Sequence, residues 1–344
     1  MIKKVAKIAL RIAALLLIVI GSNWVYEHTL YQQFLEEEGD MLRRIQKTKG
    51  QHILYFSASS NFGFNDIDTD KRRISQFIDE YFPNLSVGPV DKGAVHAGVF
   101  LPLIKQIPED ATVGTIVVAM NLRSFGPGWT NSKLETPLMK SNVMYADRPA
   151  LLNRFLVSLN YYDSKSDQER EADLMAHWKN DPLPFPAPKN TVDSWCRVDK
   201  WPGGNDPRRG EADHFIKNFG FVLDSNNKRV QDFDQIVKLA QARGFHLVFN
   251  ILAENMERAD SLVGSDLTNL MRSNRDFLTQ RYRSETVPVV DNLELLPDSL
   301  FLEEGFPTEH YLQRGRQLIA RNVAVILNHN YEGQFRPPPT PIKP

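Results

Sequence analysis

The chain has 344 residues, enough for one large domain or two small ones with a substantial core. Its 41 basic and 42 acidic side chains leave a formal net charge of −1, so bulk electrostatics give no case for nucleic-acid binding. The single cysteine, Cys196, excludes an intramolecular disulfide framework. No grouping of residues has metal-ligand spacing, so neither a metal nor another cofactor is expected.

The first 26 residues have the pattern of a membrane anchor. Basic residues precede an uncharged run from Ile12 to Tyr26 that is rich in leucine and isoleucine. Counted from Ile8, with Arg11 reaching outward, the run approaches the roughly 20 residues that cross a bilayer. A cleaved signal peptide is the alternative, but no convincing pair of small residues follows the run. The positive amino-terminal flank predicts a single-pass anchor with the N-terminus in the cytoplasm and the rest outside.

Three further regions follow this anchor. Residues 27–50 are polar and helix-permissive with sparse apolar positions, and we expect a helical stalk that lifts the domain off the membrane. Residues 51–335 are predicted to form one α/β domain. The proline-rich tail, residues 336–344, is expected to be disordered.

Short apolar runs alternate with helical periodicities along the domain. This alternation predicts a doubly wound, flavodoxin-like, five-stranded parallel sheet with helices on both faces. A stretch with poor periodicity, about 127–228, is predicted to be a large insertion that serves as a lid or cap. The predicted strands are 53–56, 85–90, 115–120, 245–252 and 287–290, and the predicted helices are 74–81, 233–240, 267–278 and 318–327.

Polar residues and glycines stand where the predicted strands end. Ser59 and Ser60 follow the first strand, Gly93 the second and Asn121 the third, and His310 precedes the last helix. In open α/β sheets these loops converge at the carboxyl edge. A serine becomes a nucleophile when a base such as histidine takes its proton. The Gly93 backbone N–H and the Asn121 amide are candidate donors to a developing oxyanion.

The order and spacing of these blocks resembles the SGNH, or GDSL-type, hydrolase superfamily. Ser57-Ala58-Ser59 falls on the family's glycine-acid-serine motif, and Gly93 and Asn121 fall on the glycine and asparagine after the next two strands. Pro307-Thr308-Glu309-His310 falls on the aspartate-x-x-histidine motif, with Gly315 five residues past the histidine. The resemblance covers about residues 51–126 and 230–327. It implies Ser59 as nucleophile, His310 as general base and then acid, and an oxyanion hole from Gly93 and Asn121.

Two departures from the family pattern leave alternatives open. Serine and alanine replace the glycine and acid of the first motif, which makes Ser60 the alternative nucleophile. Pro307 stands where the family has its aspartate. Either a nearby acid orients His310, or the histidine works in a dyad, or the protein is an inactive scaffold that serves as a binding or assembly module in the cell envelope. The nearby acids are Glu309, Glu304 and Glu303.

The resemblance implies a membrane-anchored, extracytoplasmic serine esterase or acyltransferase. Some membrane-anchored members of the superfamily modify acyl groups on cell-wall polymers or exported polysaccharides. An acyl ester on a glycan or envelope polymer is therefore the expected substrate, and no cofactor is needed.

Other residues near the predicted strand ends have weaker assignments. His96, in the loop with Gly93, is expected to be solvated, and Arg123 is a candidate for binding an anionic substrate group. Asn250, Glu254 and Asn255 end the fourth strand, where either specificity residues or a helix cap is expected. The tryptophans in the middle of the chain are expected to form the insertion's own small core rather than to stack on sugar rings.

Overall fold

The computed structural model describes residues 2–198, 206–303 and 305–337. Five strands form one parallel sheet in the order β2-β1-β3-β4-β5. This is the flavodoxin-like order of a doubly wound sheet, so the predicted fold class is confirmed. The strands are β1 (Ile53–Ser57), β2 (Val87–Asp91), β3 (Thr115–Met120), β4 (His246–Ile251) and β5 (Val289–Asp291).

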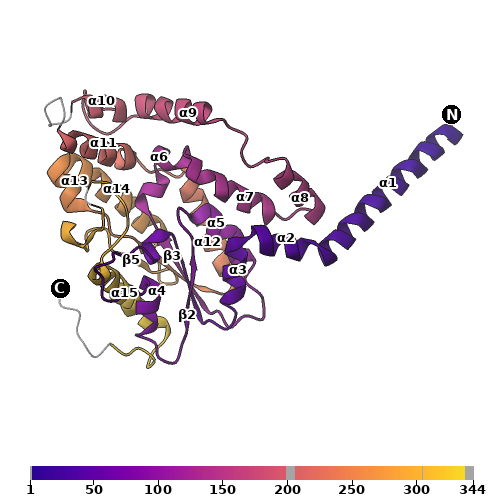
Figure 1. Cartoon of the computed structure of the whole chain (residues 1–344), viewed down its shortest axis with the longest axis horizontal. Coiled ribbons are helices and arrows are strands. Elements are labelled where there is room, and N and C mark those ends of the chain that lie inside the picture. The colour runs from indigo at the N-terminus through magenta and orange to yellow at the C-terminus, as the bar shows by residue number, and fades with distance from the viewer. Residues whose placement is uncertain (1, 199–205, 304, 338–344) are drawn as a thin grey trace.

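Helices cover both faces of the sheet (Figure 1). Alternate side chains of a strand point to opposite faces, so Leu54 and Phe56 enter one buried cluster while Ile53 and Tyr55 enter the other. The first cluster packs against α5 (Ala97–Lys105), α12 (Lys228–Arg243) and α14 (Ser265–Tyr282). The second packs against α4 (Ile74–Asp79) and α15 (Gln313–Leu327). The short helix α13 (Met256–Leu262) follows β4.

The N-terminal helix α1 (Ile2–Thr29) projects away from the sheet domain (Figure 1). Its stretch Lys4–Thr29 is long and apolar enough to span a membrane. Trp24 is exposed near the end of this stretch that is nearest the domain. A side chain of this kind suits the interface between membrane and water.

Residues 27–50 form helices, as predicted, but not a free stalk. Helices α2 (Tyr31–Glu38) and α3 (Asp40–Lys47) bury five apolar side chains in the cluster that also holds one face of the sheet. Helix α3 packs against β2 and α5. The sparse apolar positions of this segment are therefore the inward face of two helices that belong to the domain. The five are Phe34, Leu35, Met41, Leu42 and Ile45.

The insertion is helical rather than irregular. Its helix α9 (Asp167–Asn180) has no fully buried side chain and only partly buried ones such as Trp178, so its sequence carries little apolar periodicity. Trp195 is buried in the same cluster as the sheet and Trp178 packs against that cluster, which corrects the expectation of a separate small core. Trp129 is also buried, and Trp201 lies outside the described residues. The helices are α6 (Pro127–Thr130), α7 (Thr136–Met144), α8 (Ala150–Ser158), α9 (Asp167–Asn180), α10 (Val192–Arg197) and α11 (Pro207–Phe219).

Replacing Ile45 with alanine tests whether α3 is part of the domain. Ile45 is buried against the sheet cluster, so Ile45→Ala should lower the free energy of unfolding by about 2–5 kcal/mol. The matched control is Lys49→Ala, because Lys49 lies just past α3 with an exposed side chain, and such changes stay within about 0.5 kcal/mol. Urea unfolding of the full-length protein measures both. Equal midpoints for the two variants would mean that residues 27–50 stand apart from the domain.

Candidate active site

The turn after β1 presents Ser59 and hides Ser60. Ser59 opens a short 3-10 helix, η1 (Ser59–Asn61), and its carbonyl accepts hydrogen bonds from the N–H groups of Phe62 at 3.0 Å and Gly63 at 2.7 Å. Ser60 is buried, and its Oγ lies 2.9 Å from Ser57 Oγ. Ser59 is partly exposed. Of the two candidate serines, the structure therefore places Ser59 at the surface of the site.

Three side chains form a hydrogen-bonded line at this turn. His310 Nε2 lies 2.9 Å from Ser59 Oγ, and His310 Nδ1 lies 2.9 Å from Glu303 Oε1. The other carboxylate oxygen of Glu303 accepts a hydrogen bond from Thr308 Oγ1. A carboxylate on Nδ1 holds the imidazole in the tautomer that leaves Nε2 free to accept the serine proton. The line therefore has the connectivity of a serine-histidine-acid triad.

The acid in contact with His310 is Glu303 and not Glu309. The isolated antiparallel bridge between Phe301 and Tyr311, with Leu302 N–H donating to His310 C=O at 3.0 Å, folds the chain back on itself. Glu303 thereby lies beside His310 although seven residues separate them. Glu309 takes other partners, which corrects its assignment as the orienting acid. Glu304 lies outside the described residues.

Gly63 allows the close approach of His310 to the turn. A Cβ at residue 63 would lie 3.1 Å from His310 Cδ2 and 3.2 Å from Cγ. These distances are shorter than ordinary contacts between carbon atoms, so a side chain here would push the imidazole away from Ser59. No motif in the sequence indicated Gly63, because its role arises from packing across the site.

Strand register aligns the three residues that the sequence placed around the oxyanion. Ser57 pairs with Asp91, so Ser59 and Gly93 each stand two residues past that pair. Phe56 pairs with Val118, so Ser59 and Asn121 each stand three residues past that pair. The carboxyl ends of three adjacent parallel strands thus bring Ser59, Gly93 and Asn121 to one level of the sheet edge.

The Asn121 side chain is held at both ends. Its Oδ1 accepts a hydrogen bond from Ser124 N–H at 3.1 Å, and its Nδ2 donates to Glu309 Oε2 at 2.6 Å. An amide nitrogen has two N–H groups. Among the described residues, this arrangement leaves the second N–H available to an acceptor in the site.

Glu309 is fixed in turn by Arg123. Arg123 Nε and Nη2 each donate to the carboxylate at 2.9 Å, and both side chains are largely buried. The guanidinium also stacks on the Trp129 ring, 5.0 Å from its centroid. Burial works against the charge of Arg123, but Glu309 outweighs it, so the pKa of Arg123 lies above its ordinary value. Arg123 therefore binds a carboxylate of the protein, Glu309, and not the anionic substrate group that the sequence suggested.

A second carboxyl group, Glu254, is fully buried beside this pair. Burial raises its pKa well above 4.5, the Glu309 charge raises it further, and Arg123 offsets only part of the effect. Arg123 and Asn121 both donate to Glu309, whereas burial beside that carboxylate favours the neutral form of Glu254. Burial, with the same carboxyl groups nearby, also raises the pKa of Tyr311.

The other strand-end candidates have structural roles. Asn255 caps α13 by accepting a hydrogen bond from Arg258 N–H at 3.0 Å. His96 is buried rather than solvated, and its Nε2 lies 3.0 Å from Glu135 Oε1. Burial and the neighbouring Arg229 lower the pKa of His96 to about 4.

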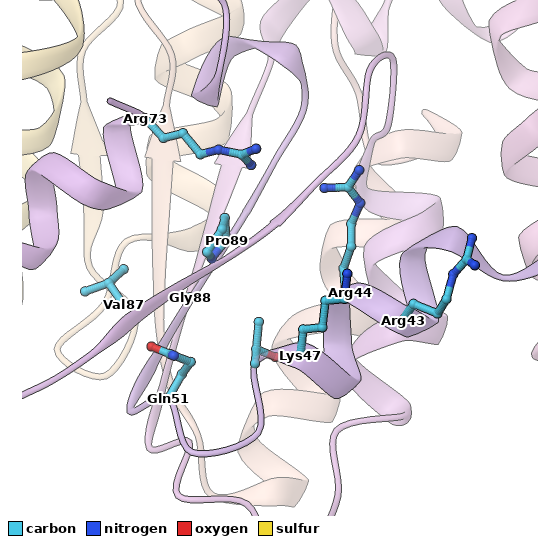
Figure 2. A pocket seen from close by; sticks show the side chains of 9 residues that line it. Arg43, Arg44, Lys47, Gln51, Arg73, Val87, Gly88 and Pro89 are labelled. Atoms are coloured by element: carbon cyan, nitrogen blue, oxygen red, sulfur yellow. The ribbon is translucent and has the colours of Figure 1, made fainter. Parts of the chain in front are cut away.

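A buried carboxylate anchors the far end of the Ser59 turn. Asp91 ends β2 and accepts hydrogen bonds from Asn61 Nδ2 at 2.7 Å, from Arg44 Nη1 at 3.0 Å and from Arg73 Nη1. Figure 2 shows Arg44 and Arg73 extending from α3 and from the start of α4 over β2, around a pocket of about 450 Å³. Helix α3 thus contributes a cation, Arg44, that supports the site.

Comparisons with known proteins give only distant similarities. No protein-family model matches the chain, and no curated protein matches it. It is similar to the crystal structure of a lipase/acylhydrolase from Enterococcus faecalis, with 9% identity, coverage of 84% of this chain and 100% of that chain, and a TM-score of 0.37. It is also similar to the lipase Lip_vut3 from a goat rumen metagenome, with 10% identity, coverage of 80% and 96%, and a TM-score of 0.37. These similarities are too low to assign a reaction to this chain.

Within the described residues, no group of three or more histidine, cysteine, aspartate and glutamate side chains is arranged to hold a metal ion. The side chains in position for chemistry are Ser59, His310 and Glu303, together with the hydrogen-bond donors around them.

Glutamine substitutions separate the two glutamates near His310. Glu303→Gln removes the charge on Nδ1 and should slow labelling of Ser59 by a fluorophosphonate by up to about 10⁴-fold, the loss seen when a triad acid is neutralised. Glu309→Gln should slow it through a different route, by loosening Asn121. Thr308→Val, which removes the hydrogen bond to Glu303, should give a smaller loss than Glu303→Gln. A Glu303→Gln protein that labels at the wild-type rate would leave His310 acting without this acid.

Glu254 should make the folded protein less stable as pH rises. Its pKa is raised in the folded state, so above pH 4.5 the unfolded chain loses this proton while the folded protein retains it. The contribution of Glu254 to the free energy of unfolding is complete below the pKa that it has in the unfolded chain. It is lost as pH rises toward the pKa that it has in the folded protein. Glu254→Gln removes this titration and should flatten the decline. The fall in unfolding free energy between about pH 5 and about pH 8 is measured for the wild type and for Glu254→Gln. The control is Glu171→Gln, because Glu171 is exposed. Parallel wild-type and Glu254→Gln profiles would contradict a protonated Glu254.

Proposed function

We propose that the protein is a serine esterase or O-acyltransferase of SGNH type, anchored in a membrane by α1 with its domain outside the cytoplasm. The observation that carries the proposal is the hydrogen-bonded line from Ser59 through His310 to Glu303. The alignment of Gly93 and Asn121 with Ser59 at the edge of the sheet supports it. The basic residues before Ile12 support the orientation of the anchor.

The mechanism follows from these positions. Ser59 Oγ attacks the acyl carbonyl carbon while His310 Nε2 takes its proton, and Glu303 stabilises the imidazolium that forms. As the carbonyl oxygen gains negative charge, it accepts hydrogen bonds from the free N–H of Asn121 and from a backbone N–H at Gly93. When the tetrahedral intermediate collapses, the alcohol leaves with the proton from His310, and the acyl group stays on Ser59.

A second nucleophile completes the reaction. His310 takes a proton from water or from an acceptor hydroxyl, whose oxygen attacks the acyl-enzyme. Release of the acyl group from Ser59 returns the proton to Oγ. Water yields hydrolysis, and a sugar or polymer hydroxyl yields acyl transfer.

The proposed substrate is an acyl ester on a glycan or envelope polymer. The side chains of His310 and Glu303 are partly exposed, so an extended polymer can reach the reacting atoms without entering a deep cavity. A domain held outside the cytoplasm by α1 would meet such polymers. The inactive scaffold was suggested by the missing aspartate; Glu303 supplies a carboxylate to His310 in its place, which favours an enzyme.

Serine replacement tests the proposed nucleophile. Wild-type protein should react with a fluorophosphonate probe, and Ser59→Ala should abolish labelling because, in the described part of the chain, Ser59 carries the hydroxyl that is bonded to His310 Nε2. Ser60→Ala is the matched control and should retain most labelling, since Ser60 is buried against Ser57. The Ser59→Ala variant should also lose the release or transfer of acetate from an O-acetylated polysaccharide. A wild-type protein that neither labels nor acts on the polysaccharide would favour the scaffold.

A further inference from the structure

Helix α8 has apolar side chains on two opposite faces. Ala150, Asn153 and Val157 are buried against the rest of the domain. At about 100° per residue, the positions 151, 152, 155 and 159 fall in an arc of about 100° on the other side of the helix. These four side chains are exposed: Leu151 by 38%, Leu152 by 42%, Phe155 by 57% and Leu159 by 60%. We call this surface the α8 stripe.

Hydrogen bonds fix the α8 stripe beside the candidate membrane span. Leu151 N–H, in the first turn of α8, donates to Asn23 Oδ1 of α1 at 3.0 Å. Asn153 Nδ2 donates to Tyr31 OH at 3.3 Å, which joins α8 to the start of α2. Figure 1 shows α8 next to the end of α1 that meets the domain. The position of α8 relative to α1 is therefore set within the fold.

The level of α8 along α1 matches a bilayer boundary. The apolar run, counted from Ile8 with Arg11 reaching outward, lies within the candidate span Lys4–Thr29. At 1.5 Å per residue, about 20 residues from Ile8 cross the roughly 30 Å of a hydrocarbon core, so the boundary on the domain's side lies near residue 28. Asn23 then lies about 7 Å inside that boundary, within the depth of about 5–10 Å to which interfacial helices bury their apolar faces. The α8 stripe lies at the same level, because Leu151 is bonded to Asn23.

We propose that α8 lies in this membrane interface and inserts the α8 stripe among the lipid chains, as a second attachment beside α1. Trp24 and Val25 of α1, the two residues after Asn23, are exposed apolar side chains as well. Arg154 extends from the side of α8 over the Phe34 ring, 4.6 Å from its centroid, which suits lipid headgroups flanking an inserted face. The proposal rests on the membrane anchorage proposed above. Two attachments would fix the tilt of the domain, which α1 alone would leave free.

Lipid quenching of a fluorophore tests this contact in the full-length protein. A Cys196→Ser background receives one cysteine for labelling with an environment-sensitive dye, at Phe155→Cys, Leu17→Cys or Val325→Cys. Leu17 lies within the candidate span, and Val325 is an exposed control on α15. The labelled proteins are placed in phosphatidylcholine vesicles that contain nitroxide-bearing phosphatidylcholine. Dye at 17 and 155 should be quenched several-fold more than dye at 325.

Each result supports or overturns the proposal. Quenching at 17 but not at 155 would keep the anchor and reject the α8 contact. Quenching at neither site would reject the anchor and the contact together. A dye at 155 that is shielded from water but not quenched by lipid would mean that a protein, such as a second copy of the chain, covers the stripe. Adding Leu152→Gln and Leu159→Gln should reduce quenching at 155 and leave quenching at 17 unchanged, since both side chains are exposed.

Discussion

The site depends on one buried ion pair, Arg123 with Glu309, which joins segments 186 residues apart. A buried pair of this kind is costly to break, because either partner alone would be a charge without a counter-ion. Glu309 and His310 are neighbours in the chain, yet the first bonds to Arg123 and the second faces Ser59. Holding Glu309 on one side therefore sets the direction of the imidazole on the other. The same carboxylate orients Asn121, so base and oxyanion donor share one support.

The parallel sheet supplies the second constraint. Register alone brings Ser59, Gly93 and Asn121 to one edge, before any side-chain contact is considered. The ion pair then brings the segment before α15 to that edge. Asp91 completes the frame by tying the Ser59 turn to Arg44 of α3. Helix α3, which lies between α1 and the sheet in the chain, therefore supports the turn that carries Ser59.

The sequence predicted the sheet, the helices around it and the meeting of Ser59 with His310, because apolar periodicity and polar strand ends are local signals. It could not select Glu303, since that choice depends on the antiparallel bridge between Phe301 and Tyr311. It also missed the packing of α3, where few apolar residues suffice because they form one face. The helix α9 was not predicted because it has no fully buried side chain and its apolar contact with the domain is limited to partly buried residues such as Trp178. Arg123 was open to a substrate role until its partner across the fold was known.

The exposure of Glu303 has a consequence for how the site responds to its surroundings. Its side chain is 42% exposed, whereas the acid of a buried triad is sheltered from dissolved ions. Mobile ions therefore screen the attraction between this carboxylate and the imidazolium, over a Debye length of about 8 Å at physiological ionic strength. A charged surface close to the site gathers counter-ions and raises the local ionic strength. It would therefore weaken the attraction by which Glu303 stabilises an imidazolium beside Ser59.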